Sequence, residues 1–178
     1  AFRPVLLTTL LTTLLAASSM APVAAAAPAE TTATAAGPRP QRVMSLNVCN
    51  DQLPMLLLPP ERIVSLTWLS RTEGDPELAA LARRIPVNHG SAEEVLVSRP
   101  DLVVAGRFTT GTTRALLRRA GIPLLELDPV MDWEGIRRVT REVAARVGAV
   151  ERGEALIAAM DAELQAIADE RPFPPVRV

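Results

Sequence analysis

From residue 42 to residue 127, short runs of aliphatic and β-branched residues alternate with segments of helical character. The predicted strands are residues 42–47, 62–67, 86–88, 102–105 and 123–127, and the predicted helices between them cover residues 51–58, a segment starting at Asp75, residues 91–98 and residues 112–120. Helices of this length between strands favour parallel pairing with right-handed crossovers. We therefore predict an α/β fold with a mainly parallel sheet flanked by helices.

Proline and glycine residues indicate where these helices begin and end. Pro54 is placed in the first turn of the 51–58 helix, where a missing N–H costs little. Asp75 precedes Pro76, which gives an N-cap followed by proline in its favoured first position. Gly121 follows the 112–120 helix as its C-cap.

The chain changes character after residue 131. Residues 132–146 are predicted to form one helix and residues 151–170 a second, in which apolar residues recur at helical spacing. A helix of about 20 residues spans roughly 30 Å, the width of a small domain. This second helix is therefore long enough to connect two lobes.

The first 41 residues have the features of an exported protein. Arg3 precedes a short apolar segment, and small residues follow as far as Ala29, so residues 1–29 are predicted to be a cleavable export signal. Residues 30–41, rich in Thr, Ala and Pro, are predicted to be a flexible leader. The expected location is the periplasm. An uncleaved membrane anchor is the alternative, although the apolar run is short and interrupted by threonines.

Composition excludes several classes of protein. The chain is 48% hydrophobic, enough for a sizeable core, and its net charge is −1. Its basic residues are all arginines apart from one histidine, and they are scattered among carboxylates, which does not favour binding to nucleic acid. Cys49 is the only cysteine, so no internal disulfide stabilises the fold.

Ligands of parallel sheets bind outside the carboxyl ends of the strands. That rule selects residues 47–50, 67–71, 88–90, 106–110 and 128–131. Arg107 and Phe108 directly follow a predicted buried strand, and a cation beside an aromatic ring suits an anionic ferric siderophore. The indole of Trp68 suits a siderophore or a corrin ring. The candidate ligand-binding residues are Asn47, Cys49, Asn50, Trp68, His89, Arg107 and Phe108.

Each candidate also has a structural interpretation. His89 has no second histidine or cysteine at metal-ligand spacing, so we expect it to line a cleft without acting as a catalyst or metal ligand. Cys49 is expected to be a small buried hydrophobe if it does not touch ligand. Arg107 could pair with a nearby carboxylate. Trp133, at a helix start, is expected in the core.

The segment around residue 91 combines a helix start with two glutamates. Ser91 and Glu94 have the spacing of a capping box, in which each side chain accepts from the other residue's backbone N–H. Glu94 is therefore predicted to be structural. Glu93 lies in the same first turn and is expected to point to solvent.

Four segments resemble the class III periplasmic substrate-binding proteins of ABC importers for cobalamin and ferric siderophores. They are residues 42–47, residues 60–66, the Ala-Glu-Glu-Val-Leu-Val-Ser-Arg-Pro-Asp-Leu-Val stretch at 92–103, and residues 116–123. The resemblance covers roughly residues 42–171. It implies two α/β lobes joined by one rigid helix, with the ligand held between them.

The resemblance also implies a domain plan and a set of partners. Residues 42–147 would be the N-terminal ligand-binding lobe, residues 148–171 the inter-lobe helix and residues 172–178 the start of a truncated second lobe. Glu93 would be the lobe-tip residue that docks onto the importer permease. The expected protein is a monomer with no catalytic residues, no cofactor and no protein-held metal.

The ligand is expected to be a ferric siderophore or cobalamin. Arg71 and Arg107 favour the siderophore, and the lack of tyrosine argues against direct coordination of iron or haem. An exported α/β enzyme and a membrane-anchored sensor domain are the alternatives. An enzyme of these classes would need a G-x-S-x-G or H-x-x-E-H motif, and the sequence contains neither.

Overall fold

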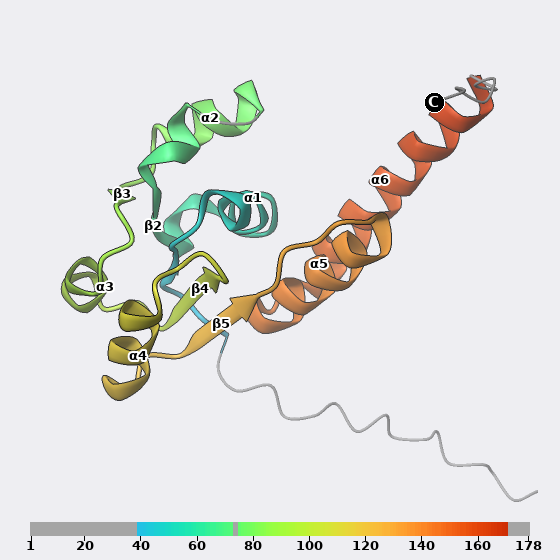
Figure 1. Cartoon of the computed structure of the whole chain (residues 1–178). Helices are drawn as coiled ribbons and strands as arrows, with labels where there is room; N and C mark the ends of the chain where they lie inside the picture. Colours follow the sequence, from blue (N-terminus) through green and yellow to red (C-terminus); the bar gives the residue numbers. More distant parts are fainter. Residues whose placement is uncertain (1–38, 73–74, 171–178) are drawn as a thin grey trace, which may run out of the picture. The chain divides into compact units, whose positions relative to one another are not determined.

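A computed structural model describes residues 39–72 and 75–170 (Figure 1). The predicted export signal at 1–29 and the predicted second-lobe segment at 172–178 lie outside these residues. The elements are β1 (Val43–Ser45), α1 (Val48–Leu57), β2 (Ile63–Thr67), α2 (Pro76–Ala82), β3 (Val87–Asn88), α3 (Ala92–Ser98), β4 (Leu102–Gly106), α4 (Gly111–Arg119), β5 (Leu124–Leu127), α5 (Trp133–Val147) and α6 (Val150–Glu170), with 3₁₀ turns at Pro60–Arg62 and Trp68–Arg71.

The strands form one parallel sheet in the order β3-β2-β1-β4-β5. The first strand, β1, lies in the middle of the sheet. Strands β2 and β3 follow on one side of it, and β4 and β5 lie on the other side. The prediction of an α/β fold with a mainly parallel sheet is confirmed. All five strands direct their carboxyl ends to the same edge, which is the edge where ligands bind in such sheets.

Alternating residues of the strands build two separate cores. Val43 of β1 packs with residues of α1, α2 and α5, whereas its neighbour Met44 packs with residues of α3 and α4. In β4, Val104 belongs to the first core and Val103 to the second, and all four side chains are fully buried. This period of two means that both faces of the sheet are covered by helices.

Helix α1 begins earlier than predicted. The Asn47 side chain accepts a hydrogen bond from the Cys49 N–H at 2.9 Å, which caps the helix at residue 47. Pro54 consequently lies inside the helix, and its placement in the first turn was wrong. The missing N–H of Pro54 leaves the Asn50 carbonyl without its usual helical partner. The predicted N-caps at Asp75 and Ser91 are confirmed. The C-cap of α4 (Gly111–Arg119) is Ala120, one residue before the predicted Gly121, which follows it with a left-handed φ of 70°.

Helices α5 and α6 form an antiparallel pair connected by two residues. Gly148 ends α5 with a left-handed φ of 70°. Two ion pairs join the helices: Arg137 contacts Asp161 at 2.6 Å, and Arg141 contacts Glu154 at 2.8 Å. Figure 1 shows α6 continuing past the end of α5. Helix α6 matches the predicted long helix in position and length.

Gly153 allows α5 and α6 to pack closely. A Cβ atom at this position would lie 2.5 Å from the Cβ of Ala144, which is fully enclosed between the two helices. On an open helix face, Gly→Ala stabilises by up to about 1 kcal/mol. At this contact we expect the opposite sign, with Gly153→Ala lowering the free energy of unfolding by about 1–3 kcal/mol because the helices must separate.

Urea unfolding of Gly153→Ala beside Ala158→Gly measures this effect. Ala158 is exposed on the same helix, so its replacement reports only the loss of helix propensity, about 1 kcal/mol. A Gly153→Ala variant more stable than the wild type would contradict the close contact.

The residues just before β1 contact the lobe. The Gln41 N–H donates to Asp101 Oδ2 at 2.7 Å, and the Arg62 guanidinium donates to the carbonyl of Pro40 and, at 2.8 Å, to that of Val147. Residues 40 and 41, which the sequence assigned to a flexible leader, are thus hydrogen-bonded to Arg62 and Asp101 of the lobe. Arg62 joins the start of β1 to the end of α5.

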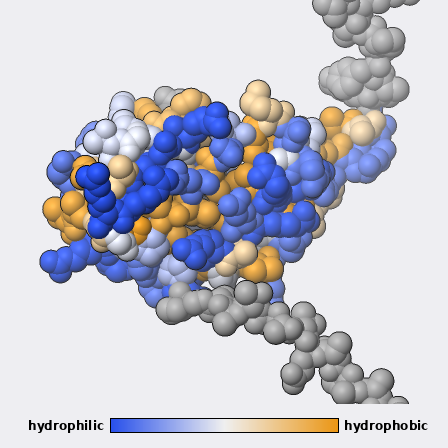
Figure 2. Space-filling model, turned by 60° about the horizontal axis from the view of Figure 1, so that its bottom comes forward, coloured by the Kyte–Doolittle hydropathy of each residue, from blue (hydrophilic) through white to orange (hydrophobic). Residues whose placement is uncertain are grey.

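The outer surface carries both hydrophilic and hydrophobic residues. Figure 2 shows hydrophilic residues over much of one face, with hydrophobic residues exposed between them. None of the helices within residues 39–72 and 75–170 has the length and apolar character needed to span a membrane.

Candidate ligand-binding site

The strand order places the predicted ligand loops in a row along one edge of the sheet. From β3 to β5, the residues that follow the strands are His89, Trp68, the segment from Asn47, Arg107 and Asp128. Adjacent strands are about 4.8 Å apart, so β3 and β4 are separated by about 14 Å. A ligand at this edge can therefore contact several of the loops at once.

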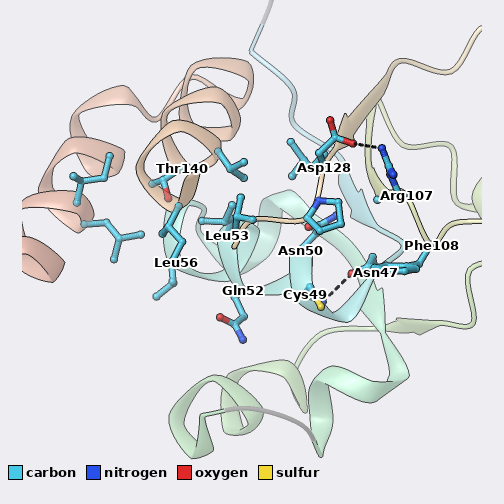
Figure 3. A pocket seen from close by; sticks show the side chains of 18 of the residues that line it. Asn47, Cys49, Asn50, Gln52, Leu53, Leu56, Arg107, Phe108, Asp128 and Thr140 are labelled. Carbon is cyan, nitrogen blue, oxygen red and sulfur yellow. Dashed lines mark hydrogen bonds and ion pairs between the residues drawn. The ribbon is translucent and has the colours of Figure 1, made fainter. Parts of the chain in front are cut away.

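A cavity of about 480 Å³ opens at this edge beside α1, α5 and α6. Figure 3 shows Arg107, Phe108 and Asp128 on one side of it and Leu53, Leu56 and Thr140 on the other. The lining residues are Asn47, Cys49, Asn50, Gln52, Leu53, Leu56, Gly106, Arg107, Phe108, Leu127, Asp128, Pro129, Val130, Ile136, Val139, Thr140, Leu156, Ile157 and Met160. Five of the seven predicted ligand residues therefore line one cavity.

The loop after β1 supplies amides and a thiol to the cavity. Cys49 is exposed, so the expectation that it is buried was wrong; it lies in the first turn of α1, on the side facing the cavity. The Asn50 Nδ2 atom is buried and donates to no described atom. A Cβ on Gly106 would lie 3.1 Å from that nitrogen, so glycine allows the amide to lie against the end of β4.

The loops after β4 and β5 supply one cation, one anion and an aromatic ring. Arg107 lies 3.6 Å from Asp128, and both side chains are more than 70% exposed, so the pair is weak and open to exchange with a charged ligand. Phe108 is 75% exposed although it is a large apolar residue. Among the residues that the structure describes, Arg107 and Asp128 are the only charged ones that line the cavity, and their charges cancel.

Trp68 and His89 do not line this cavity, and they form a second group at the same edge. Their rings are 6.5 Å apart and stacked, and both side chains are exposed. Glu94 accepts from the backbone N–H groups of His89 and Ser91 and contacts the imidazole Nδ1 at 3.0 Å. Partial desolvation would raise the pKa of Glu94, but the hydrogen bonds from His89 and Ser91 outweigh it and lower the pKa to about 2.

Asp51 is a fully buried carboxyl group beneath this edge. Burial raises its pKa to about 6, although the hydrogen bonds from Thr67 and the nearby hydroxyl groups of Ser45 and Ser70 oppose the shift. Its Oδ2 accepts from the backbone N–H and the hydroxyl of Thr67, whereas Oδ1 has no described partner. Asp51 therefore holds the residue that immediately precedes Trp68.

Two sequence expectations about large or charged residues were wrong. Trp133 was expected in the core but is 53% exposed; it is the first residue of α5, directly after the Asp132 cap. Arg71 was expected near the ligand, but its guanidinium donates to the Ile85 carbonyl at 2.8 Å beside α2. Arg71 therefore supports the lobe and supplies no charge to the cavity.

The sequence reasoning also missed the helical walls of the cavity. Leu53 and Leu56 come from α1, Ile136, Val139 and Thr140 from α5, and Leu156, Ile157 and Met160 from α6. Their helical spacing was visible, but spacing identifies an apolar face without showing which cavity that face lines. Met131 was inside a predicted loop and is 94% exposed.

Glu93 lies on α3, next to the group formed by Trp68 and His89. Its side chain is exposed as predicted, and among the described residues it forms no ion pair or hydrogen bond. Its neighbour Glu94 completes the capping box with Ser91, so the predicted structural role of Glu94 is confirmed.

Solved structures show which fold this is. RhuT, a periplasmic haem-binding protein from Roseiflexus sp. RS-1, matches with a TM-score of 0.63 and 27% identity over 76% of this chain and 52% of its own. A possible iron-binding, periplasmic solute-binding protein of Staphylococcus epidermidis matches with a TM-score of 0.67 at 14% identity, covering 79% and 55%. The vitamin B12-binding protein BtuF of Vibrio cholerae matches at 0.58 with 18% identity, covering 74% and 51%. The chain has the fold of class III periplasmic substrate-binding proteins.

The described residues correspond to the amino-terminal lobe of that fold and the long helix that follows it. The chain spans about half the length of the solved structures it matches. The three structures named above are described as periplasmic proteins, and a further match, from Listeria monocytogenes, is described as an ABC transporter substrate-binding protein. The sequence matches no protein-family model and no curated protein.

Proposed function

We propose that this protein is the periplasmic solute-binding component of an ABC importer and that it captures a broad, mainly apolar metal chelate. The observation that carries the proposal is the set of large apolar side chains left exposed along the carboxyl edge of the sheet. Trp68 follows β2, Phe108 follows β4, and Met131 and Trp133 follow β5. Exposed apolar groups gathered beside a cavity mark a binding surface.

The charges of the site favour a ligand with little net charge. Arg71 does not line the cavity and donates to the Ile85 carbonyl, and Arg107 is balanced by Asp128, so neither of the arginines that favoured a siderophore gives the cavity a net positive charge. Amides and aromatic rings remain as the main contacts. Cobalamin fits these contacts better than an anionic ferric siderophore does, and haem becomes a third candidate because several matched structures are described as haem-binding.

A transport role without catalysis agrees with the matched structures, which are binding proteins. The permease is the proposed partner, and the ligand would be held between this lobe and a second one. No described feature specifically favours an exported enzyme or a membrane-anchored sensor. The ligand titration described below tests the transport role against both alternatives.

Titration of the full-length protein with cyanocobalamin, hemin and a ferric hydroxamate tests the proposal. Trp68 lies at the same edge of the sheet as the cavity, so its fluorescence is expected to fall on binding, with dissociation constants near or below 1 μM for at least one macrocycle. Phe108→Ala should weaken that binding by about 1–2 kcal/mol, or roughly 5–30-fold. Leu116→Ala, on an exposed residue of α4 away from the edge, is the matched control. A protein that binds none of the three ligands would contradict the transport function.

A further inference from the structure

The loop between β4 and α4 carries two residues of the cavity mouth whose side chains have few neighbours. Arg107 is 72% exposed and pairs with Asp128 at 3.6 Å, and Phe108 is 75% exposed. A ring as exposed as that of Phe108 is not fixed by packing. The direction of both side chains therefore depends on what holds the backbone of the loop.

Thr109 closes the turn of this loop. Its N–H donates to the Gly106 carbonyl at 3.0 Å, and its hydroxyl accepts from the Gly106 N–H at 3.3 Å. Thr109 is buried, so these bonds are sheltered from water. They join Gly106 to Thr109, but the carbonyl of Arg107, which belongs to the peptide group next to Phe108, takes no part in them.

Arg114, near the start of α4, reaches back to that peptide group. Its Nη1 lies 3.4 Å from the carbonyl oxygens of both Gly106 and Arg107, so one guanidinium contacts two consecutive peptide groups. Each contact is long for a hydrogen bond, but the donor is charged, which strengthens it. The two carbonyls are thus directed toward α4, while the side chains of Arg107 and Phe108 are exposed at the cavity mouth (Figure 3).

Glu126 of β5 holds Arg114 from the other side. The Arg114 Nε lies 3.4 Å from Glu126 Oε2, and the guanidinium of Arg118 contacts Glu126 Oε1. The side chain of Arg114 is 24% exposed and that of Glu126 35% exposed, so their ion pair is less screened than the pair of Arg107 with Asp128. The firmer ion pair therefore lies behind the loop, and the exchangeable one lies at the cavity.

We infer that Arg114 is a positioning residue of the ligand-binding site, which fixes the backbone between β4 and α4 so that Phe108 is presented to the ligand. This inference rests on the proposed function and concerns how its site gains affinity. Arg114 is absent from the described residues that line the cavity, so it acts through the loop. A loop that is already held in its binding orientation loses less conformational entropy when the ligand arrives.

A double-mutant cycle in the full-length protein tests the inference, with cyanocobalamin, hemin and a ferric hydroxamate as probes. Arg114→Met retains the apolar stem and removes the contacts with both carbonyls. We expect it to weaken binding of the probe that the wild type binds by about 3–10-fold. In a Phe108→Ala background the same substitution should cost less than about 2-fold, because the ring that Arg114 positions is gone.

Arg118→Met is the matched control. Arg118 contacts Glu126 from the same helix but makes none of the described contacts with the loop carbonyls, so its loss should change affinity by less than about 2-fold. Arg114→Lys retains the charge with a single donor nitrogen and should recover part of the affinity that Arg114→Met loses. Urea unfolding of each variant shows that the protein measured is folded.

The outcomes separate this inference from the proposed function. An equal loss of affinity on Arg114→Met with and without Phe108 would overturn the positioning role and leave the proposed function intact. The same conclusion would follow if Arg118→Met weakened binding as much as Arg114→Met does. A wild type that binds none of the three probes would overturn both.

Discussion

Replacing Glu93 with arginine is expected to abolish uptake of the ligand without changing its affinity for the binding protein. Glu93 is exposed on the first turn of α3 and forms no ion pair or hydrogen bond among the described residues, so its charge is available to a partner. One exposed ion pair contributes only about 0–1 kcal/mol. The resemblance to binding proteins of ABC importers implies arginines on the permease opposite this residue. A reversed charge would face them, and like charges at an interface cost several kcal/mol, more than 10-fold in affinity.

The chain offers a closely matched control for this variant. Glu77 is also the second residue of a seven-residue helix, is also exposed, and also follows a capped start. Glu77→Arg loses the same favourable interaction with the helix dipole, about 0.3–1 kcal/mol, but lies on α2. Uptake in cells should be lost with Glu93→Arg and retained with Glu77→Arg, with equal ligand affinity in vitro. Normal uptake by the Glu93 variant would reject the docking role.

Asp51→Asn is expected to stabilise the protein at neutral pH by about 1–2 kcal/mol. The pKa of Asp51 is about 6 in the folded protein and 3.8 when exposed to water, so the folded state binds the proton more tightly. Stability due to this group is therefore highest below pH 3.8, falls as the pH rises to about 6, and stays low above it. The pKa difference corresponds to about 3 kcal/mol. An unpaired amide N–H at the position of Oδ1 is expected to offset about 1–2 kcal/mol of that gain.

Urea unfolding at pH 4 and pH 8 measures this prediction. The wild type should lose more stability between these pH values than Asp51→Asn, because only the wild type must ionise a buried carboxyl. Asp51→Ala should be less stable than both at either pH, since the Thr67 N–H and hydroxyl lose their acceptor. An asparagine variant that is less stable than the wild type at pH 8 would show that the buried charge is favourable.

Asp51 lowers the stability of the fold at neutral pH but also supports the ligand-binding edge. Thr67, which Asp51 holds through two hydrogen bonds, is the last residue of β2, and Trp68 comes next. The carboxyl group therefore stabilises the start of the loop that carries one of the exposed aromatic residues. Nothing in the sequence marked Asp51 for this role, because a polar residue in the first turn of a helix is usually exposed.

Local sequence patterns determined the elements and most of their ends. The runs that became β1, β2 and β4 are mainly aliphatic and β-branched, and near-continuous apolar runs of this kind predict strands that are buried on both faces. The capping box of Ser91 and Glu94 is likewise a contact between neighbours in the chain. The start of α1 was misplaced because Asn47 could end a strand or cap a helix, and the sequence pattern did not distinguish the two.

The site was only partly predictable, because its walls come from segments far apart in the chain. The rule for parallel sheets located the loops that begin at Asn47, Arg107 and Asp128, since strand ends are local features. It could not show that α5 and α6 close the cavity, that Arg71 turns away to Ile85, or that Trp133 stays exposed. The sequence by itself determined which residues lie at the carboxyl edge. Only the tertiary structure decided which of them share a cavity and which charges are already paired, because those outcomes depend on packing between elements that local propensity does not encode.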